Sequence, residues 1–83
     1  MKITFKLFAT LSDYLPPERH YNALELDVAP HTTIGDLVER FRLPAKQVHL
    51  VLVNGVFIEP QLRTNRTLSD GDVLAIWPPV AGG

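Results

Sequence analysis

The sequence predicts a single α+β domain in which one helix packs across one face of a mixed β-sheet. Two observations lead to this fold class: several segments alternate apolar and polar residues, and one segment between them has helical spacing. The chain has 83 residues, a length that fits one domain with one core. With 46% hydrophobic residues and no cysteine, this core must be stabilised by apolar burial and not by disulfides.

The first part of the chain supplies two strands. In residues 3–7 apolar side chains alternate with threonine and lysine, which is the period of a half-buried strand. Residues 11–21 contain two prolines and several polar residues, and we interpret them as a connecting loop or short turn. Residues 24–28 alternate again, with leucine and valine on one face and acidic residues on the other, and predict a second strand.

One helix is expected to follow the second strand. Thr33 and Asp36 have the spacing of a capping box, in which two side chains satisfy free backbone N–H groups at the helix start. The helix should end at Leu43-Pro44, because proline cannot continue it. Its apolar stripe consists of Ile34, Leu37, Val38 and Phe41.

Three further strands are predicted in the second half. Residues 48–53 form an apolar run interrupted only by a histidine, and Asn54-Gly55 is a tight turn into a short strand at 56–58. Residues 69–72 make another turn before the last strand at 73–77. This order of elements is the pattern of a β-grasp, or ubiquitin-like, fold with the first and last strands as central parallel neighbours. The expected core includes Ile3, Phe5, Leu26, Ile34, Leu37, Phe41, Leu52 and Ile76.

The later strands also indicate an interaction surface. Residues 50–53 and 73–77 are apolar on both faces of the strand, but one helix covers only one face of a sheet. An exposed apolar patch on a small domain usually marks an interaction site. We therefore expect a partner surface opposite the helix that includes Phe57 and Trp77; coverage of this face by connecting loops is the alternative.

Charge and composition argue against several functions. Eight basic and nine acidic residues give a net charge of −1, which argues against nucleic-acid binding. No stretch has the length of a signal peptide's apolar run or of a membrane span, so we expect a cytoplasmic protein without membrane contact. The three histidines fall in separate elements, and Ser12 and Ser69 lack a base, so we expect neither a metal site nor an enzyme of its own.

The sequence finishes with Gly82-Gly83, after a Pro-Pro-Val-Ala segment. Proline favours an extended path, and glycine admits the backbone where any Cβ would clash. We expect a domain at 1–77 and a flexible tail at 78–83, which would reach about 20 Å when extended and could enter another protein's active site. The carboxylate of Gly83 is the expected reactive group, but it is ionised at neutral pH and must be activated first.

Several of these motifs occur together in a known family. Asp70-Gly71-Asp72, the apolar strand after it and the Pro-Pro-Val-Ala-Gly-Gly ending resemble the C-terminal signature of the MoaD/ThiS family of sulfur carriers. The segments Lys6-Leu7-Phe8-Ala9-Thr10-Leu11, Thr33-Ile34-Gly35-Asp36-Leu37 and Val53-Asn54-Gly55 are also similar to its members. The resemblance covers essentially the whole chain.

The resemblance implies a non-catalytic carrier that binds no cofactor itself. An E1-like adenylyltransferase would use ATP to adenylate Gly83, and a sulfur donor would replace AMP to leave a thiocarboxylate. A larger synthase subunit would then accept the sulfur, and the Pro-Pro ending favours the molybdopterin branch. The tail residues that the partners would recognise are Pro78, Pro79, Val80, Ala81 and Gly82.

Other functions remain open from the sequence. Related carriers supply sulfur for thiamine, cysteine or transfer-RNA thiolation. A ubiquitin-like modifier attached to lysines through Gly83 would share the adenylation step. A plain β-grasp interaction domain with an accidental diglycine is the third alternative.

Overall fold

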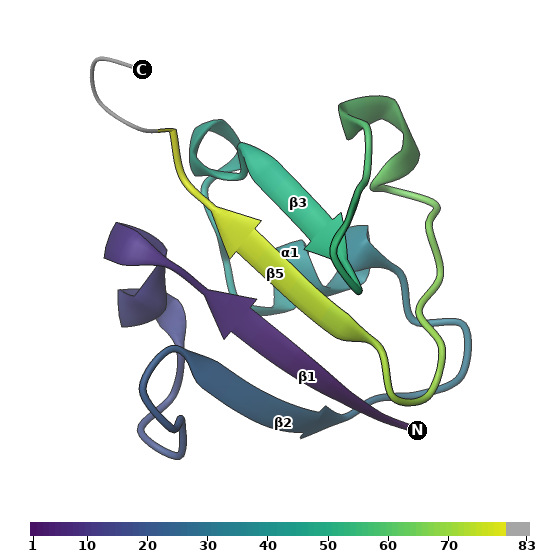
Figure 1. Cartoon of the computed structure of the whole chain (residues 1–83), viewed down its shortest axis with the longest axis horizontal. Helices are drawn as coiled ribbons and strands as arrows, with labels where there is room; N and C mark the ends of the chain where they lie inside the picture. Colours follow the sequence, from purple (N-terminus) through teal and green to yellow (C-terminus); the bar gives the residue numbers. More distant parts are fainter. Residues whose placement is uncertain (80–83) are drawn as a thin grey trace.

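A computed structural model, which describes residues 1–79, has the β-grasp architecture (Figure 1). Its sheet has five strands in the order β2-β1-β5-β3-β4. The parallel pair β1 and β5 is flanked on both sides by antiparallel pairs. The predicted fold class and the central parallel pair are therefore confirmed. The strands are β1 (Lys2–Leu7), β2 (Ala23–Asp27), β3 (Leu50–Val53), β4 (Val56–Phe57) and β5 (Val73–Trp77).

The helix α1 (Ile34–Arg40) begins as the sequence predicts. The Thr33 side chain accepts a hydrogen bond from the Asp36 amide at 3.0 Å, and the Asp36 carboxylate accepts one from the Thr33 amide at 2.9 Å. This reciprocal pair is a complete capping box. The helix ends sooner than its apolar stripe, because Phe41 is its C-cap and Arg42 has a left-handed φ of 57°.

Three short 3₁₀ helices connect these elements: η1 (Ala9–Tyr14), η2 (Ala45–Gln47) and η3 (Pro60–Leu62). The interpretation of residues 11–21 as a loop or short turn is wrong at its start, where η1 extends to Tyr14. Leu11 and Leu15 are buried in the core. Their burial orders this segment, although its polar residues and prolines are typical of a loop.

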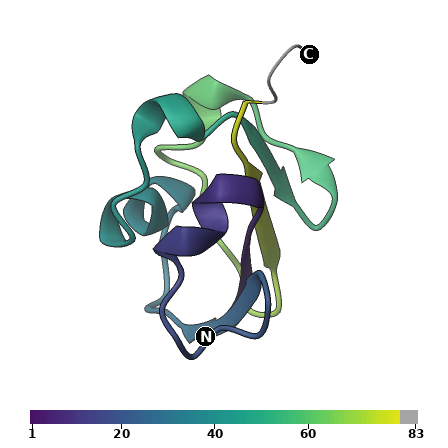
Figure 2. The same cartoon turned by 90° about the vertical axis from the view of Figure 1, so that its left-hand side faces the viewer.

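The core lies between the sheet and the helices that cover one side of it. Figure 2 shows α1 and η1 on the same side of the sheet. The prediction that Leu52 belongs to the core is wrong. Leu52 is only half-buried and lies on the sheet face opposite the core, while Val51 and Val53 point inward. Phe41 is partly buried and packs against Phe5 with 4.9 Å between ring centroids. The main buried cluster includes Ile3, Phe5, Leu7, Leu26, Ile34, Leu37, Val51, Leu74 and Ile76.

The buried residues of the connecting segments join the same core. Leu11, Leu15 and Leu68 belong to one cluster with Ile34 and Leu37, on the helix side of the sheet.

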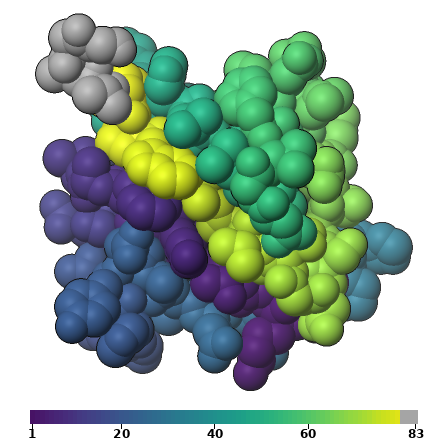
Figure 3. Space-filling model, viewed as in Figure 1, coloured from purple at the N-terminus to yellow at the C-terminus, as the bar shows by residue number. Residues whose placement is uncertain are grey.

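The opposite face of the sheet is left open, and Figure 3 shows β5 as a continuous band at the surface between β1 and β3. The loop coverage considered from the sequence is therefore not observed. Along residues 1–79, no helix combines the length and apolar character needed to cross a membrane.

Candidate functional site

The candidate site begins where β5 ends, at a segment that we call the tail root, Trp77-Pro78. Trp77 is half-buried, Pro78 is buried and Pro79 is exposed. Pro78 was assigned to the flexible tail from the sequence, but it packs as part of the domain. The remaining predicted site residues Val80, Ala81, Gly82 and Gly83 lie outside the described residues.

Two segments hold the tail root from opposite sides. On one side, the Phe8 amide donates to the Ile76 carbonyl at 3.1 Å, and the Phe8 ring stacks on the Trp77 indole with 4.0 Å between centroids. On the other side, the His49 amide donates to the Trp77 carbonyl at 3.1 Å. The direction in which the chain leaves the sheet is thus fixed by contacts from the residue after β1 and from the segment before β3.

Beside the tail root lies an apolar surface that we call the open face. It consists of Leu50, Leu52, Phe57 and Trp77, which share one side of the sheet around the buried Ala75. Leu52 is directly opposite both Phe57 and Ala75, and Leu50 is directly opposite Trp77. Residues that pair across strands point to the same face, so their side chains form one patch. The structure therefore places the predicted partner residues Phe57 and Trp77 on one face, with Phe57 the more accessible at 50% exposed.

The open face has a charged border along β1 and β2. Lys6 is directly opposite Ala75, so its ammonium group adjoins the apolar patch. Lys2 is directly opposite Asp27, and Thr4 is directly opposite Glu25. The sheet surface thus changes from apolar over β3, β4 and β5 to mixed charge over β1 and β2, as in the core and rim of a typical protein interface.

Arg63 is the buried charged residue of the described part of the chain, at 9% exposure. Its guanidinium donates three hydrogen bonds to backbone carbonyls: Nε to Ile58 at 3.0 Å, Nη1 to Val48 at 3.2 Å and Nη2 to His49 at 3.1 Å. Burial lowers the pKa of Arg63 from its ordinary value. The guanidinium carbon also lies 5.8 Å from the centroid of the Phe57 ring.

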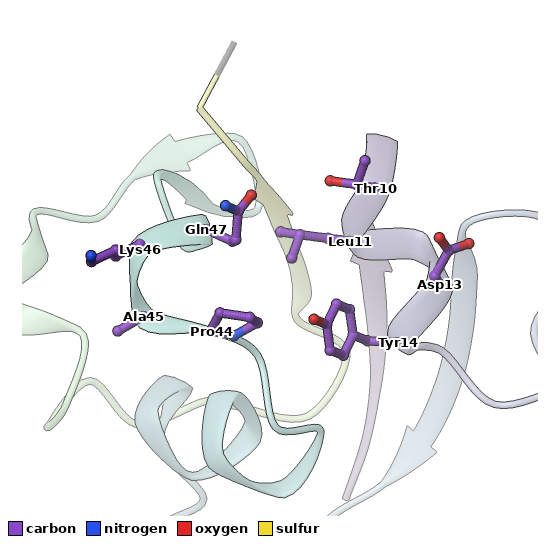
Figure 4. Close-up of a pocket in the computed structure, with 8 residues that line it drawn as sticks. All are labelled: Thr10, Leu11, Asp13, Tyr14, Pro44, Ala45, Lys46 and Gln47. Carbon is purple, nitrogen blue, oxygen red and sulfur yellow. The ribbon is translucent and has the colours of Figure 1, made fainter. Parts of the chain in front are cut away.

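A groove of about 800 Å³ separates η1 from η2 (Figure 4). Leu11 and Tyr14 line one side, and Pro44 and Ala45 line the other. In Figure 4 the Tyr14 side chain reaches from η1 toward Pro44. The groove is also lined by Thr10, Asp13, Lys46 and Gln47, so it offers a mixed polar and apolar surface.

The acidic turn before β5 has a structural function. The Asp70 carboxylate accepts from the Lys2 amide at 2.8 Å, and the Asp72 carboxylate accepts from the Ser69 amide at 2.8 Å. Asp72 also accepts from the Asn54 side chain at 2.8 Å. These bonds connect the turn to β1 and to the β3–β4 turn. Within residues 1–79, no three His, Asp or Glu residues are grouped so as to hold a metal ion.

Two residues of the site were not found from the sequence. Phe8 follows β1 and continues its register with β5, so its place beside Trp77 could have been inferred from the predicted parallel pairing. Arg63 lies in a polar, irregular segment, and no pattern in the sequence distinguishes it from the exposed Arg66 nearby. Its burial depends on carbonyl groups that only the folded hairpin brings together.

The sequence matches the model of the family described as Mut7-C ubiquitin over residues 1–82. SAMP1, small archaeal modifier protein 1, from Haloferax volcanii is 27% identical over 100% of both chains, with a TM-score of 0.68. The HVO 2177 protein of Haloferax volcanii is 26% identical over 100% of this chain and 87% of that chain, with a TM-score of 0.74.

A more distant match comes from the complex of subunits 1 and 2 of the molybdopterin-converting factor from Helicobacter pylori. One chain of that complex is 20% identical to this protein over 100% of both chains, with a TM-score of 0.59, and has the same fold. No curated protein matches the sequence. The matches confirm the resemblance to a ubiquitin-like family that the motifs indicated.

Proposed function

The chain belongs to the Mut7-C ubiquitin family, and we propose that it is a sulfur carrier whose reacting group is the carboxylate of Gly83. The observation that carries the proposal is the position of the tail root at the margin of the open face. Trp77 belongs to both, so a partner that covers Leu50 and Leu52 also lies beside Pro78, from which the sequence continues to Gly83. Docking on the domain and access to the tail are thereby combined in one surface.

The proposed chemistry takes place at the Gly83 carboxyl carbon and is catalysed by partners. A carboxylate oxygen attacks the α-phosphorus of ATP, pyrophosphate leaves, and an acyl adenylate forms. The terminal sulfur of a persulfide then attacks the acyl carbon, and AMP leaves with the electron pair of the broken C–O bond. Reduction of the resulting S–S bond by a thiol leaves a thiocarboxylate on Gly83, which a second partner uses as sulfur donor.

The residues of this chain contribute binding and positioning. Trp77 and Pro78 fix the point at which the tail begins, because both pack against the domain. Proline at 78 and 79 restricts the conformations that the partner has to order, which lowers the entropy cost of binding. The glycines at 82 and 83 allow the backbone to approach the nucleotide closely.

Two partners are proposed: an E1-like adenylyltransferase and an acceptor synthase subunit. The Helicobacter pylori protein with the same fold is a subunit of a molybdopterin-converting factor complex, which supports a second subunit as partner. The Pro-Pro-containing tail favours the molybdopterin precursor as acceptor.

A second candidate function is attachment to other proteins. SAMP1, which is named a modifier, is 27% identical to this chain. In that case the acyl adenylate, or a thioester formed from it, would react with a lysine amine in place of a sulfur donor. Both functions require the same adenylation step at Gly83.

The experiment that tests the proposal is ATP–pyrophosphate exchange with the adenylyltransferase of the same organism. The natural chain should support exchange. A variant with one residue added after Gly83 should not, because the carboxylate moves by about 3.5 Å and small misplacements of reacting atoms cost about 100-fold in rate. Gly82→Ala should also lose exchange while melting like the natural chain. Full activity of the extended variant, without processing back to Gly83, would contradict the proposal.

A further inference from the structure

The buried guanidinium of Arg63 has no carboxylate among the three hydrogen-bond acceptors described above. It is bound by the carbonyls of Val48, His49 and Ile58. A buried charge is costly and is retained only where several hydrogen bonds compensate for lost hydration. A planar guanidinium can serve three carbonyls in fixed directions, whereas the ammonium group of lysine is a compact point charge. The arrangement therefore depends on arginine in particular.

The three carbonyls lie at the open end of the β3–β4 hairpin. Val48 and His49 precede β3, and Ile58 follows β4. Two residue pairs join β3 to β4, which is an edge strand of two residues, and beside them the Ile58 amide donates to the Val51 carbonyl at 2.9 Å. Such a short ladder fixes a strand weakly. The bonds from Arg63 therefore add to this short ladder in holding β4, and Phe57 within it, against the start of β3.

The same guanidinium also contacts the partner surface and the support of the tail root. Its carbon lies 5.8 Å from the Phe57 centroid, within the range of a cation–π interaction. The His49 carbonyl accepts from Arg63, and the His49 amide donates to the Trp77 carbonyl. One peptide segment thus links Arg63 to the tail root, and the same guanidinium lies over the ring of Phe57.

We propose that Arg63 is a positioning residue, which holds Phe57 and the tail root at a fixed separation for a partner that has to engage both. This inference rests on the proposed function. Arg63 acts through Phe57 and His49 and does not touch the reacting atoms. Its loss should therefore weaken docking of the carrier and leave the adenylation step unchanged.

The test uses Arg63→Lys, which keeps the positive charge but loses the three-carbonyl geometry. In ATP–pyrophosphate exchange with the adenylyltransferase of the same organism, KM for the carrier should rise roughly tenfold with kcat unchanged. Arg66→Lys is the matched control, because Arg66 is exposed and undergoes the same chemical change. It should leave KM as in the natural chain.

A double-substitution cycle separates positioning from a general loss of stability. In a Phe57→Ala background, Arg63→Lys should raise KM far less than in the natural chain, because the ring that it positions is gone. Equal effects in both backgrounds, or a fall in kcat with KM unchanged, would overturn the inference. If Arg63→Lys does not fold, Phe57→Leu takes its place: it should raise KM, and a KM equal to that of the natural chain would overturn the inference.

A measurement without any partner distinguishes this inference from the proposed function. Amide hydrogen exchange at His49 should be faster in Arg63→Lys than in Arg66→Lys. The His49 amide binds the Trp77 carbonyl, and the Val48 and His49 carbonyls on either side of it lose their hydrogen bonds from Arg63. Absence of pyrophosphate exchange in the natural chain contradicts the proposed function, and the His49 comparison still decides the part assigned to Arg63. Equal His49 exchange in the two variants would contradict it.

Discussion

The ring of Phe8 lies parallel to the indole of Trp77, with 4.0 Å between the ring centroids and 6° between the ring planes. Phe8 is the residue before η1, and Trp77 is the last residue of β5. The stack therefore ties the segment after the first strand to the place where the tail begins. Phe8 is thus a support of the tail root.

Replacing Phe8 by leucine should remove the stacking while keeping an apolar side chain. We expect the free energy of unfolding to fall by about 0.5–1.5 kcal/mol, the usual contribution of an aromatic pair beyond its burial. Urea denaturation followed by fluorescence measures this change, since Trp77 is the one tryptophan of the chain. Tyr21→Leu is the control and should lower the midpoint much less, because Tyr21 is 83% exposed and its edge contact with His20 lies at the surface. An equal midpoint for both variants would show that the stack contributes nothing.

Leu37→Ala tests the contact between α1 and the sheet. Leu37 is 1% exposed, so its truncation should cost about 2–5 kcal/mol, from lost transfer free energy and from the cavity left behind. Leu62→Ala is the matched control, because Leu62 is 55% exposed and should cost little. Chemical denaturation of both variants measures the difference. Similar midpoints would mean that α1 does not pack as described.

Asn54 joins the β3–β4 turn to the turn before β5. Its side-chain amide donates to Asp72, and its side-chain oxygen accepts from the Val73 amide, both at 2.8 Å. Its φ of 52° lies in the left-handed region. Asn54→Gly keeps this conformation accessible and should lose about 1 kcal/mol of stability from the missing hydrogen bonds. Asn54→Ala should lose about 1 kcal/mol more, because alanine is strained at positive φ.

Thermal or urea denaturation of the two Asn54 variants separates the two effects. A glycine variant as stable as the natural chain would mean that the side-chain bonds do not contribute. Equal stability of the glycine and alanine variants would mean that backbone strain is absent.

The elements were predicted well where local signals and burial agree. The capping box at Thr33, the Asn54-Gly55 turn and the alternation in β1 each have a local cause, and each is found in the structure. The same signals fail for residues 50–53, where both faces are apolar. Nothing in such a run distinguishes inward from outward residues, and Leu52 was therefore wrongly placed in the core.

The candidate site was predicted only in part, for a similar reason. Phe57 and Trp77 follow from the surplus of apolar residues on the later strands, and the structure places both on the open face. The supports of this face depend on long-range pairing. Phe8 reaches Trp77 through the β1–β5 register, and Arg63 binds carbonyls from two segments of the hairpin.

The open face should dominate the affinity for a partner protein. Phe57→Ala should weaken binding to the adenylyltransferase by roughly tenfold or more, since aromatic residues within an interface carry much of its binding energy. Tyr21→Ala is the control: Tyr21 is an exposed aromatic residue next to β2, at the opposite edge of the sheet from β4. Titration calorimetry on both variants gives the comparison. Equal losses of affinity would place the partner surface elsewhere.

The central claim, that Gly83 carries sulfur, is tested most directly by mass spectrometry of the intact protein isolated from its native cells. The predicted result is a fraction of the protein with the mass increase of one oxygen replaced by sulfur, localised to Gly83 by fragmentation. Localisation is necessary because oxidation of Met1 adds nearly the same mass. The claim would be contradicted if every molecule carried an unmodified Gly83 carboxylate in cells that are actively making the sulfur-containing product. An isopeptide bond from Gly83 to lysine would instead identify the protein as a modifier.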